Sequence, residues 1–236
     1  MSDRLKSILF ASALCVVCSM LLTAAATGLK DFQERNIVLD KQKNILGAVG
    51  LIKKGQKIPA AAIEKLYQQS IRRIWIGPSG KIVPEAERNP GDLRLYFYML
   101  QGKIEAYIVP IDAKGLWGRI LGYMAIRKDG TTIAGFTVYK HSETPGLGGE
   151  IEKEWFQRNF MGKRIVDQNG EFVSIAIAKG TVAQTVSKEK QPNWVDGISG
   201  ATLTGKFLTA SMKEDLLAYE PVAIRFRSKR IGGLPQ

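Results

Sequence analysis

The chain contains very little histidine and cysteine, and this shortage excludes several kinds of site. His141 is the only histidine among 236 residues, so a metal site built from several histidines is excluded and no metal is expected. A Ser-His-Asp hydrolase would need an exposed nucleophile motif, which the sequence lacks. Cys15 and Cys18 lie inside an apolar run, where we interpret them as small apolar residues and not as a redox pair. The rest of the chain has no cysteine and can form no internal disulfide.

Acidic residues are also scarce, because 22 Asp and Glu stand against 34 Lys and Arg and give a formal charge of +12. Such a charge raises the question of nucleic acid or anionic lipid as a partner. The basic residues form short, scattered clusters, and no zinc finger, recognition helix or base-stacking motif organises them. We therefore expect no nucleic-acid partner. The clusters are either solvated faces or docking points for acidic partner subunits and lipid headgroups.

The chain has a long uncharged run near its start. Residues 8–29 are 22 residues without a charge, long enough to cross about 30 Å of hydrocarbon as a helix. Arg4 and Lys6 precede the run and favour a cytoplasmic N-terminus. Residues 1–29 are therefore predicted to be a retained single-pass anchor in the cell inner membrane, with the main domain periplasmic. The alternative is a cleavable signal peptide, although the run exceeds an h-region of about 7–15 residues.

After this run, the pattern first indicates helices. Residues 30–46 mix charged and apolar side chains, as a stalk helix would. A stripe formed by Ile63, Leu66, Tyr67 and Ile71 follows Pro59 and predicts an amphipathic helix. We therefore assign residues 30–90 to a helical stalk and packing helices.

From residue 91 the pattern changes to strands separated by turns. Strand-like runs occupy 93–98, 103–109, 120–127, 132–139 and 172–177. Turn dipeptides lie at Gln101-Gly102, Asp129-Gly130 and Asn169-Gly170. The predicted fold class is α+β, with one transmembrane helix followed by an antiparallel-sheet domain over 91–236 that helices flank. No alternating βαβ series is present, so an independent NADH site is not expected.

A group of small and hydroxyl residues precedes the last helix-like run. Gly197 and Gly200 can adopt positive φ, and Ser199 and Ala201 let a ligand approach the backbone. Apolar spacings of three and four from Thr204 onward predict a helix. A phosphate would fit at its N-terminus, where Lys206 adds charge. The alternative is that the Ser and Thr residues are ordinary N-caps.

The run Ser199-Gly200-Ala201-Thr202-Leu203-Thr204 resembles the flavin-attachment motif S-G-A-T-x-S/T, whose last hydroxyl forms a phosphoester with FMN. The membrane-proximal segment, Gly115-Leu116-Trp117 and residues 143–150 extend the resemblance to the covalent-FMN subunit of the sodium-translocating NADH:quinone oxidoreductase. The resemblance implies covalent FMN on Thr204, one-way electron relay to other membrane subunits, sodium export by the complex, and a flavin transferase that uses FAD. The nearest alternative is the covalent-flavin subunit of an Rnf-type ferredoxin:NAD oxidoreductase. A second is a membrane-anchored binding module without a cofactor.

The same resemblance places the loop over residues 143–150 beside the flavin. Thr144, Pro145, Gly146, Leu147 and Gly148 are expected to form a flavin-binding loop that supplies backbone N–H groups to the ring carbonyls and the apolar side chain of Leu147. Glu143 and Glu150 are expected either to contact the ring or ribityl chain or to have an ordinary turn or helix-cap role. Pro and Gly also predict a structured turn here, and a plain connection into a short helix is the alternative. Trp117 is expected either to stack on the ring or to be an ordinary core or interface tryptophan. The family usually has Gly before Glu-Thr-Pro-Gly, whereas this chain has His141-Ser142.

Overall fold

The computed structural model describes residues 2–229. These residues form two compact units, and the boundary between the units in the chain lies between Asp40 and Lys41. The first unit contains α1 (Asp3–Gly28) and the larger part of α2 (Lys30–Ala48). α1 is long and apolar enough to cross a membrane, and none of its residues is buried by the rest of the protein. A continuous apolar surface of this kind is suited to lipid. The helix predicted over 30–46 is confirmed by α2.

The second unit is built on a six-stranded antiparallel sheet in the order β2-β1-β3-β4-β5-β6. Its strands are β1 (Ile71–Ile76), β2 (Ile82–Val83), β3 (Leu93–Leu100), β4 (Lys103–Lys114), β5 (Arg119–Arg127) and β6 (Ile133–Lys140). The turns at Gln101-Gly102 and Asp129-Gly130 connect β3 to β4 and β5 to β6, as predicted. Gly102 and Gly130 have φ of 75° and 69°, the left-handed conformation that favours glycine in tight turns.

Helices and short elements complete this unit. The α-helices are α3 (Ala60–Ser70), α4 (Glu154–Arg158), α5 (Val182–Thr185), α6 (Thr202–Ala218) and α7 (Glu220–Arg227). The short elements are the 3-10 turns η1 (Glu85–Glu87), η2 (Gly148–Glu152) and η3 (Gln191–Asn193), and the parallel pair β7 (Ala176–Ile177) and β8 (Trp194–Val195). The helix predicted after Pro59 is α3. The α+β class is confirmed.

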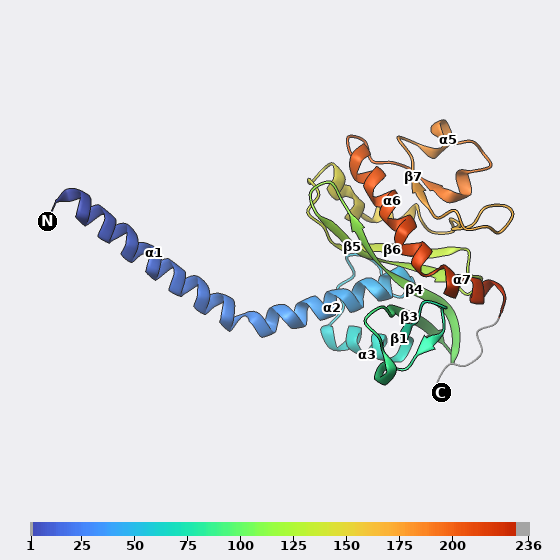
Figure 1. Ribbon diagram of the computed structural model, residues 1–236, viewed down its shortest axis with the longest axis horizontal. Coiled ribbons are helices and arrows are strands. Elements are labelled where there is room, and N and C mark those ends of the chain that lie inside the picture. The colour runs from blue at the N-terminus through green and yellow to red at the C-terminus, as the bar shows by residue number, and fades with distance from the viewer. Residues whose placement is uncertain (1, 230–236) are drawn as a thin grey trace. The chain divides into compact units, whose positions relative to one another are not determined.

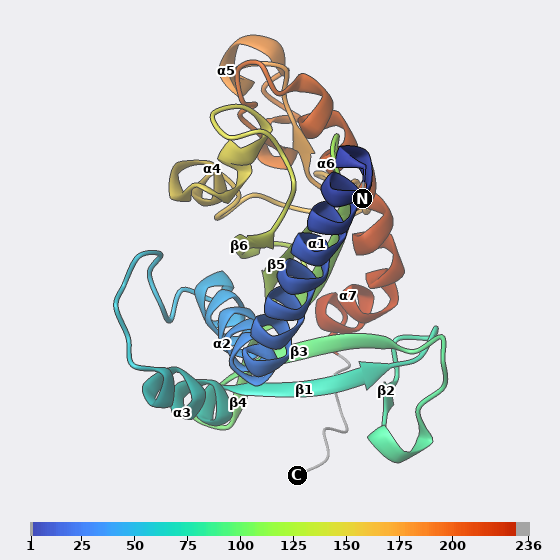
Figure 2. The same cartoon turned by 90° about the vertical axis from the view of Figure 1, so that its left-hand side faces the viewer.

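Side chains along each strand alternate between the two faces of the sheet, and helices pack against both faces. On one face, Phe97 of β3 packs in a core with Leu208 of α6 and with residues of α4 and α7. On the other face, Tyr96 packs with Ile63 of α3 and with Ile45 at the end of α2. Figure 1 shows α6 and α7 lying across the sheet, and Figure 2 shows α3 beside the start of β1. α6 is therefore held in place by the core along its length.

Two parts of the second unit differ from the sequence prediction. Residues 30–90 contain β1 and β2 in addition to helices, and β1 pairs with β3 inside the main sheet. Ile71, assigned above to a helical stripe, is the first residue of β1. The strand predicted over 172–177 is wrong except for β7 (Ala176–Ile177), because Ser174 has φ of 71° and cannot continue an extended strand. The N–H groups of Val173 and Ser174 instead both donate to the Ile165 carbonyl, at 3.0 and 2.9 Å.

Candidate functional site

The hydroxyl-rich motif lies at the start of α6. Gly200 has φ of 74°, Ala201 is the N-cap residue, and Thr202, Leu203 and Thr204 form the first turn. No side chain in the described residues caps this end, so the ordinary N-cap interpretation of Ser199 and the threonines does not hold. The first backbone N–H groups of a helix have no partners within it. This helix therefore begins with donors directed out of the helix, as anion binding requires.

Gly197 has a different role from the one predicted. It does not adopt positive φ, and a Cβ at this position would lie only 2.0 Å from the Ala178 carbonyl oxygen. Glycine is needed here for close contact between two backbone segments. Asp196, just before it, accepts a 2.6 Å hydrogen bond from the Val182 N–H at the start of α5. These two residues therefore support the loop in front of the motif.

The Thr204 hydroxyl meets the carboxylate of Glu143 in the interior of the protein. Thr204 Oγ1 donates a 2.5 Å hydrogen bond to Glu143 Oε2, and the two residues are 2% and 4% exposed. The Trp117 backbone N–H donates to the other carboxylate oxygen, Oε1, at 2.9 Å. The two motifs that the sequence singled out, together with the turn between β4 and β5, therefore converge on one carboxylate.

Glycines make this convergence sterically feasible. A Cβ on Gly115 would lie 2.5 Å from Glu143 Oε1, and one on Gly148 would lie 2.6 Å from Thr204 Oγ1 and 2.8 Å from Glu143 Oε2. A Cβ on Gly200 would lie 2.7 Å from Cδ2 of Leu147. Gly115 was not predicted as a site residue, and its only sequence signal was its place in the run Gly115-Leu116-Trp117. The glycines keep the space around the carboxylate and hydroxyl free.

The loop before η2 begins with the structured turn that its Pro and Gly residues predicted. Pro145 is followed by Gly146 with φ of 75°, and the Leu147 N–H donates to the Thr144 carbonyl at 3.1 Å. This is the pattern of a type II turn. The Gly149 N–H donates to the same carbonyl at 2.9 Å, which draws the chain back towards Glu143. The turn leaves Leu147 on the surface beside Gly200.

Apolar side chains are exposed around the buried pair. Leu147 is 43% exposed, Leu203 is 51% exposed and Trp117 is 69% exposed, so the core interpretation of Trp117 is wrong. Ser199, Thr202 and Lys206 are exposed near the same helix end, as are Thr144, Pro145 and Gly146 in the loop. A planar apolar ring and a phosphate are the two ligand parts that such a surface and such a helix end would accept.

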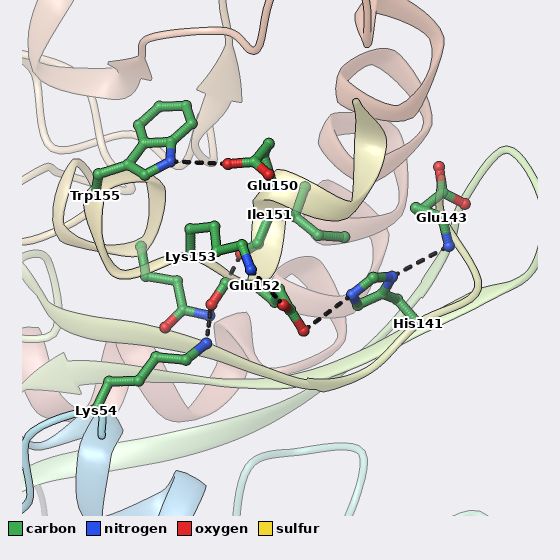
Figure 3. Close-up of polar contacts among 9 residues, drawn as sticks. Lys54, His141, Glu143, Glu150, Ile151, Glu152, Lys153 and Trp155 are labelled. Carbon is green, nitrogen blue, oxygen red and sulfur yellow. Dashed lines mark hydrogen bonds and ion pairs between the residues drawn. The ribbon is translucent and has the colours of Figure 1, made fainter. Parts of the chain in front are cut away.

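A second network holds the backbone of Glu143. The Glu143 N–H donates to Nδ1 of His141 at 3.1 Å, and Nε2 of His141 lies 3.3 Å from Glu152 Oε2, as Figure 3 shows. This arrangement assigns the proton of the ring to Nε2. A hydrogen bond from Lys153, together with His141 and nearby lysine charge, holds the pKa of Glu152 below its usual value. The sequence offered no signal for this network, because it depends on how η2 folds back on the end of β6.

The residues at this site fit FMN. They provide a hydroxyl in a first helical turn, free backbone donors for a phosphate and exposed apolar side chains for a ring. A family model for the FMN-binding domain matches residues 115–216, from the β4–β5 turn to the last part of α6. The chain is thus a protein with an FMN-binding domain and one helix able to act as a single-pass anchor.

Similar proteins of known family identify the family to which this FMN-binding-domain protein belongs. The NqrC protein of the Na(+)-translocating NADH-quinone reductase of Yersinia pestis is 34% identical over 229 residues, covering 84% of this chain and 83% of the relative. Its counterpart from Vibrio vulnificus is 32% identical over 215 residues, covering 81% and 82%. The chain belongs to the NqrC family of Na(+)-translocating NADH-quinone reductase subunits. It is therefore part of an oxidoreductase, and the other subunits of that complex are its partners.

Solved structures agree with this fold. The crystal structure of NqrC from Parabacteroides distasonis has a TM-score of 0.70 and 28% identity, covering 83% of this chain and 96% of that one. The Shewanella oneidensis protein, at 24% identity and a TM-score of 0.66, covers 83% of this chain and 99% of its own and shows the fold alone. Family membership distinguishes the chain from the Rnf-type protein, and the FMN-binding domain argues against a cofactor-free module.

Proposed function

We propose that the chain carries FMN covalently bound through a phosphoester to Thr204, and that it relays electrons within a membrane complex that oxidises NADH, reduces quinone and exports sodium. The observation that carries this proposal is the position of the Thr204 hydroxyl. It lies in the first turn of an uncapped helix, hydrogen-bonded to a buried carboxylate and next to exposed apolar side chains. A phosphate on this oxygen would be at the positive end of the α6 dipole.

The surrounding residues divide into two groups under this proposal. Ser199, Lys206 and the backbone N–H groups of Gly200, Thr202 and Leu203 would bind or neutralise the phosphate. The Ala201 N–H already donates to the Ile198 carbonyl at 3.1 Å, so Ala201 would contribute only its small size. Trp117, Leu147 and Leu203 would exclude water from one side of the ring. Within residues 144–148, the N–H groups of Thr144, Gly146 and Gly148 would be the donors to its carbonyls, because Pro145 has no N–H and the Leu147 N–H donates to the Thr144 carbonyl. FMN itself supplies the redox chemistry, because its ring accepts electrons and passes them on. The protein binds and orients it, and no side chain needs to react in the relay.

The membrane orientation is also a proposal. Arg4 and Lys6 lie before the apolar part of α1 and would remain cytoplasmic, so residues after Lys30 would be periplasmic in a Gram-negative cell. A covalent bond would then prevent loss of FMN into a compartment that does not replace it. A reporter fused after Gln236 should be active only outside the cytoplasm, and the mature protein should retain its first helix. A mature N-terminus near Ala26 would contradict the anchor and support a signal peptide.

The attachment site is tested by mass spectrometry of peptides. Protein made together with a flavin transferase should be yellow, and the colour should stay with the polypeptide after denaturation. Thr204→Ala should abolish the FMN adduct. The matched control is Thr202→Ala, two residues earlier in the same helical turn, which should keep the adduct on Thr204 even if loading is slower. An FMN adduct on Thr202, Ser199 or another residue in the unsubstituted chain would refute the assignment.

A further inference from the structure

Glu143 is a buried carboxylate without a cationic partner. Its side chain accepts hydrogen bonds from two uncharged donors, the Thr204 hydroxyl and the Trp117 backbone N–H. Among residues 2–229, no lysine, arginine or histidine side chain pairs with its carboxylate, and His141 contacts only its backbone N–H. Burying a carboxylate without an opposite charge destabilises a fold. The buried position of the Glu143 carboxylate therefore indicates a role in function and not in stability.

The partner of this hydrogen bond points to that role. Thr204 Oγ1 donates to Glu143 Oε2, so the carboxylate already contacts the proton that the hydroxyl must lose on attack. A threonine hydroxyl is a weak nucleophile, and an adjacent base that accepts its proton is the usual means of activating it. The base must itself be held in place, and here the Trp117 N–H and the His141 ring hold its carboxylate and its backbone.

We propose that Glu143 is the proton acceptor when Thr204 is flavinylated, so that the chain supplies a catalytic residue for its own modification. This inference rests on the proposed covalent attachment. Thr204 Oγ1 attacks the FMN phosphorus of FAD bound to the transferase, and its O–H bond breaks as the proton passes to Glu143 Oε2. The new bond joins Oγ1 to phosphorus, and the phosphoanhydride bond breaks. AMP leaves with the electron pair of that bond, the proton later passes to water, and nothing is oxidised or reduced.

The neighbouring acidic side chains have other hydrogen-bond partners and cannot take the proton of Thr204. Glu150 lies in the same turn as Gly148, but its Oε2 accepts a 3.2 Å hydrogen bond from the Trp155 indole, as Figure 3 shows. Glu152 is bound to His141 and Lys153. Within the described residues, only Glu143 accepts a hydrogen bond from the Thr204 hydroxyl. Glu154, exposed at the start of α4 and 3.8 Å from Arg158, lies outside the loop over 143–150. Glu154→Gln is therefore the control, because it makes the same chemical change at a carboxylate outside the site.

The test measures attachment and not electron transfer. The full-length chain, made without transferase and purified in detergent, is mixed with excess transferase, FAD and Mg²⁺, and the FMN adduct is followed by mass spectrometry. We expect Glu143→Gln to lower the first-order rate by about 100-fold or more, within the range of general-base catalysis. Glu154→Gln should react at the rate of the unsubstituted chain. Circular dichroism checks that each variant is folded.

Two substitutions distinguish a base from a positioning residue. Glu143→Gln keeps the length of the side chain and a hydrogen-bond acceptor but cannot take up the proton, whereas Glu143→Asp keeps a carboxylate on a shorter side chain. Glu143→Asp should therefore react more slowly than the unsubstituted chain but faster than Glu143→Gln, and it also serves if Glu143→Gln does not fold. A folded Glu143→Gln with an unchanged rate, or one that reacts faster than a folded Glu143→Asp, would overturn the role of Glu143 alone. Absence of any adduct on Thr204 in the unsubstituted chain would instead overturn the proposed function.

Discussion

Replacing Gly148 by alanine should disrupt the buried pair at the centre of the site. The new methyl carbon would lie 2.6 Å from Thr204 Oγ1 and 2.8 Å from Glu143 Oε2, whereas carbon atoms in favourable contact are separated by about 3.5–4.0 Å. Both partner side chains are buried and held by the core, so neither can move aside freely. The methyl group must therefore separate the hydroxyl from the carboxylate.

The size of the effect follows from two overlapping costs. Overpacking a well-packed site costs about 1–3 kcal/mol. Losing a hydrogen bond to a charged group costs about 1.5–3 kcal/mol. One displacement causes both, so the free energy of unfolding should fall by about 2–4 kcal/mol. For a domain of this size that corresponds to a fall in Tm of about 5–15 °C.

The assay is thermal unfolding of the detergent-solubilised full chain, with FMN loading measured well below the Tm of the variant. Loading should drop sharply although the protein is folded at that temperature. The control is Gly91→Ala, because a Cβ at Gly91 meets no atom within 4 Å and its φ is not positive. Its Tm should be unchanged or slightly higher. Gly148→Ala with the Tm and the FMN loading of the unsubstituted protein would show that the three residues do not pack as described.

Three further predictions concern stability, each measured as Tm of the full chain. The hydroxyl of Tyr107 is fully buried without a partner in the described residues, so Tyr107→Phe should raise stability by about 1 kcal/mol, and a loss of stability would reveal a missed partner. Burial raises the pKa of Asp215, with repulsion from Asp112 adding to it. The folded state thus binds this proton more tightly, and its contribution to stability is largest at low pH and falls as pH rises above about 3.8. The change in stability caused by Asp215→Asn should therefore be more favourable at pH 7 than at pH 4. An equal change at the two pH values would refute this. Gly80→Ala combines φ of +70° with a 2.7 Å contact to the Pro221 carbonyl carbon, so it should cost more than about 1 kcal/mol, whereas an unchanged Tm would argue against this packing of α7.

Local sequence signals predicted the parts of the fold that local chemistry controls. Gln101-Gly102 and Asp129-Gly130 predicted their hairpins because the turns need left-handed residues there. A helix from Thr204 onward was predicted from apolar spacing, and α6 begins two residues earlier, at Thr202. β1 was missed because Ile71 has a helical spacing from Ile63 and Tyr67, and only pairing with β3 makes it a strand. Ser174 was misassigned because residue propensities record neither its positive φ nor the hydrogen bond from its N–H to the Ile165 carbonyl.

The candidate site shows the same division. The motif around Thr204 and the turn at Pro145-Gly146 were both visible as patterns of residue types. The contact between the two motifs through the Glu143 carboxylate was not visible in the sequence. Glu143 and Thr204 are 61 positions apart, and only the folded sheet brings them together. Gly115 was missed for a related reason, since its importance lies in the space it leaves for a side chain from another loop.

The separation between Glu143 and Thr204 also bears on biogenesis. One residue follows β6 and the other lies in α6, and the intervening chain includes α4, β7, α5 and β8. The hydroxyl and its carboxylate are therefore in contact only when α6 is packed against the end of the sheet that bears β6. Under the proposed function, a transferase would meet a reactive threonine only on a folded chain. FMN loading would then report on folding, because only folded chains would carry the cofactor. Misfolded chains would not consume FAD.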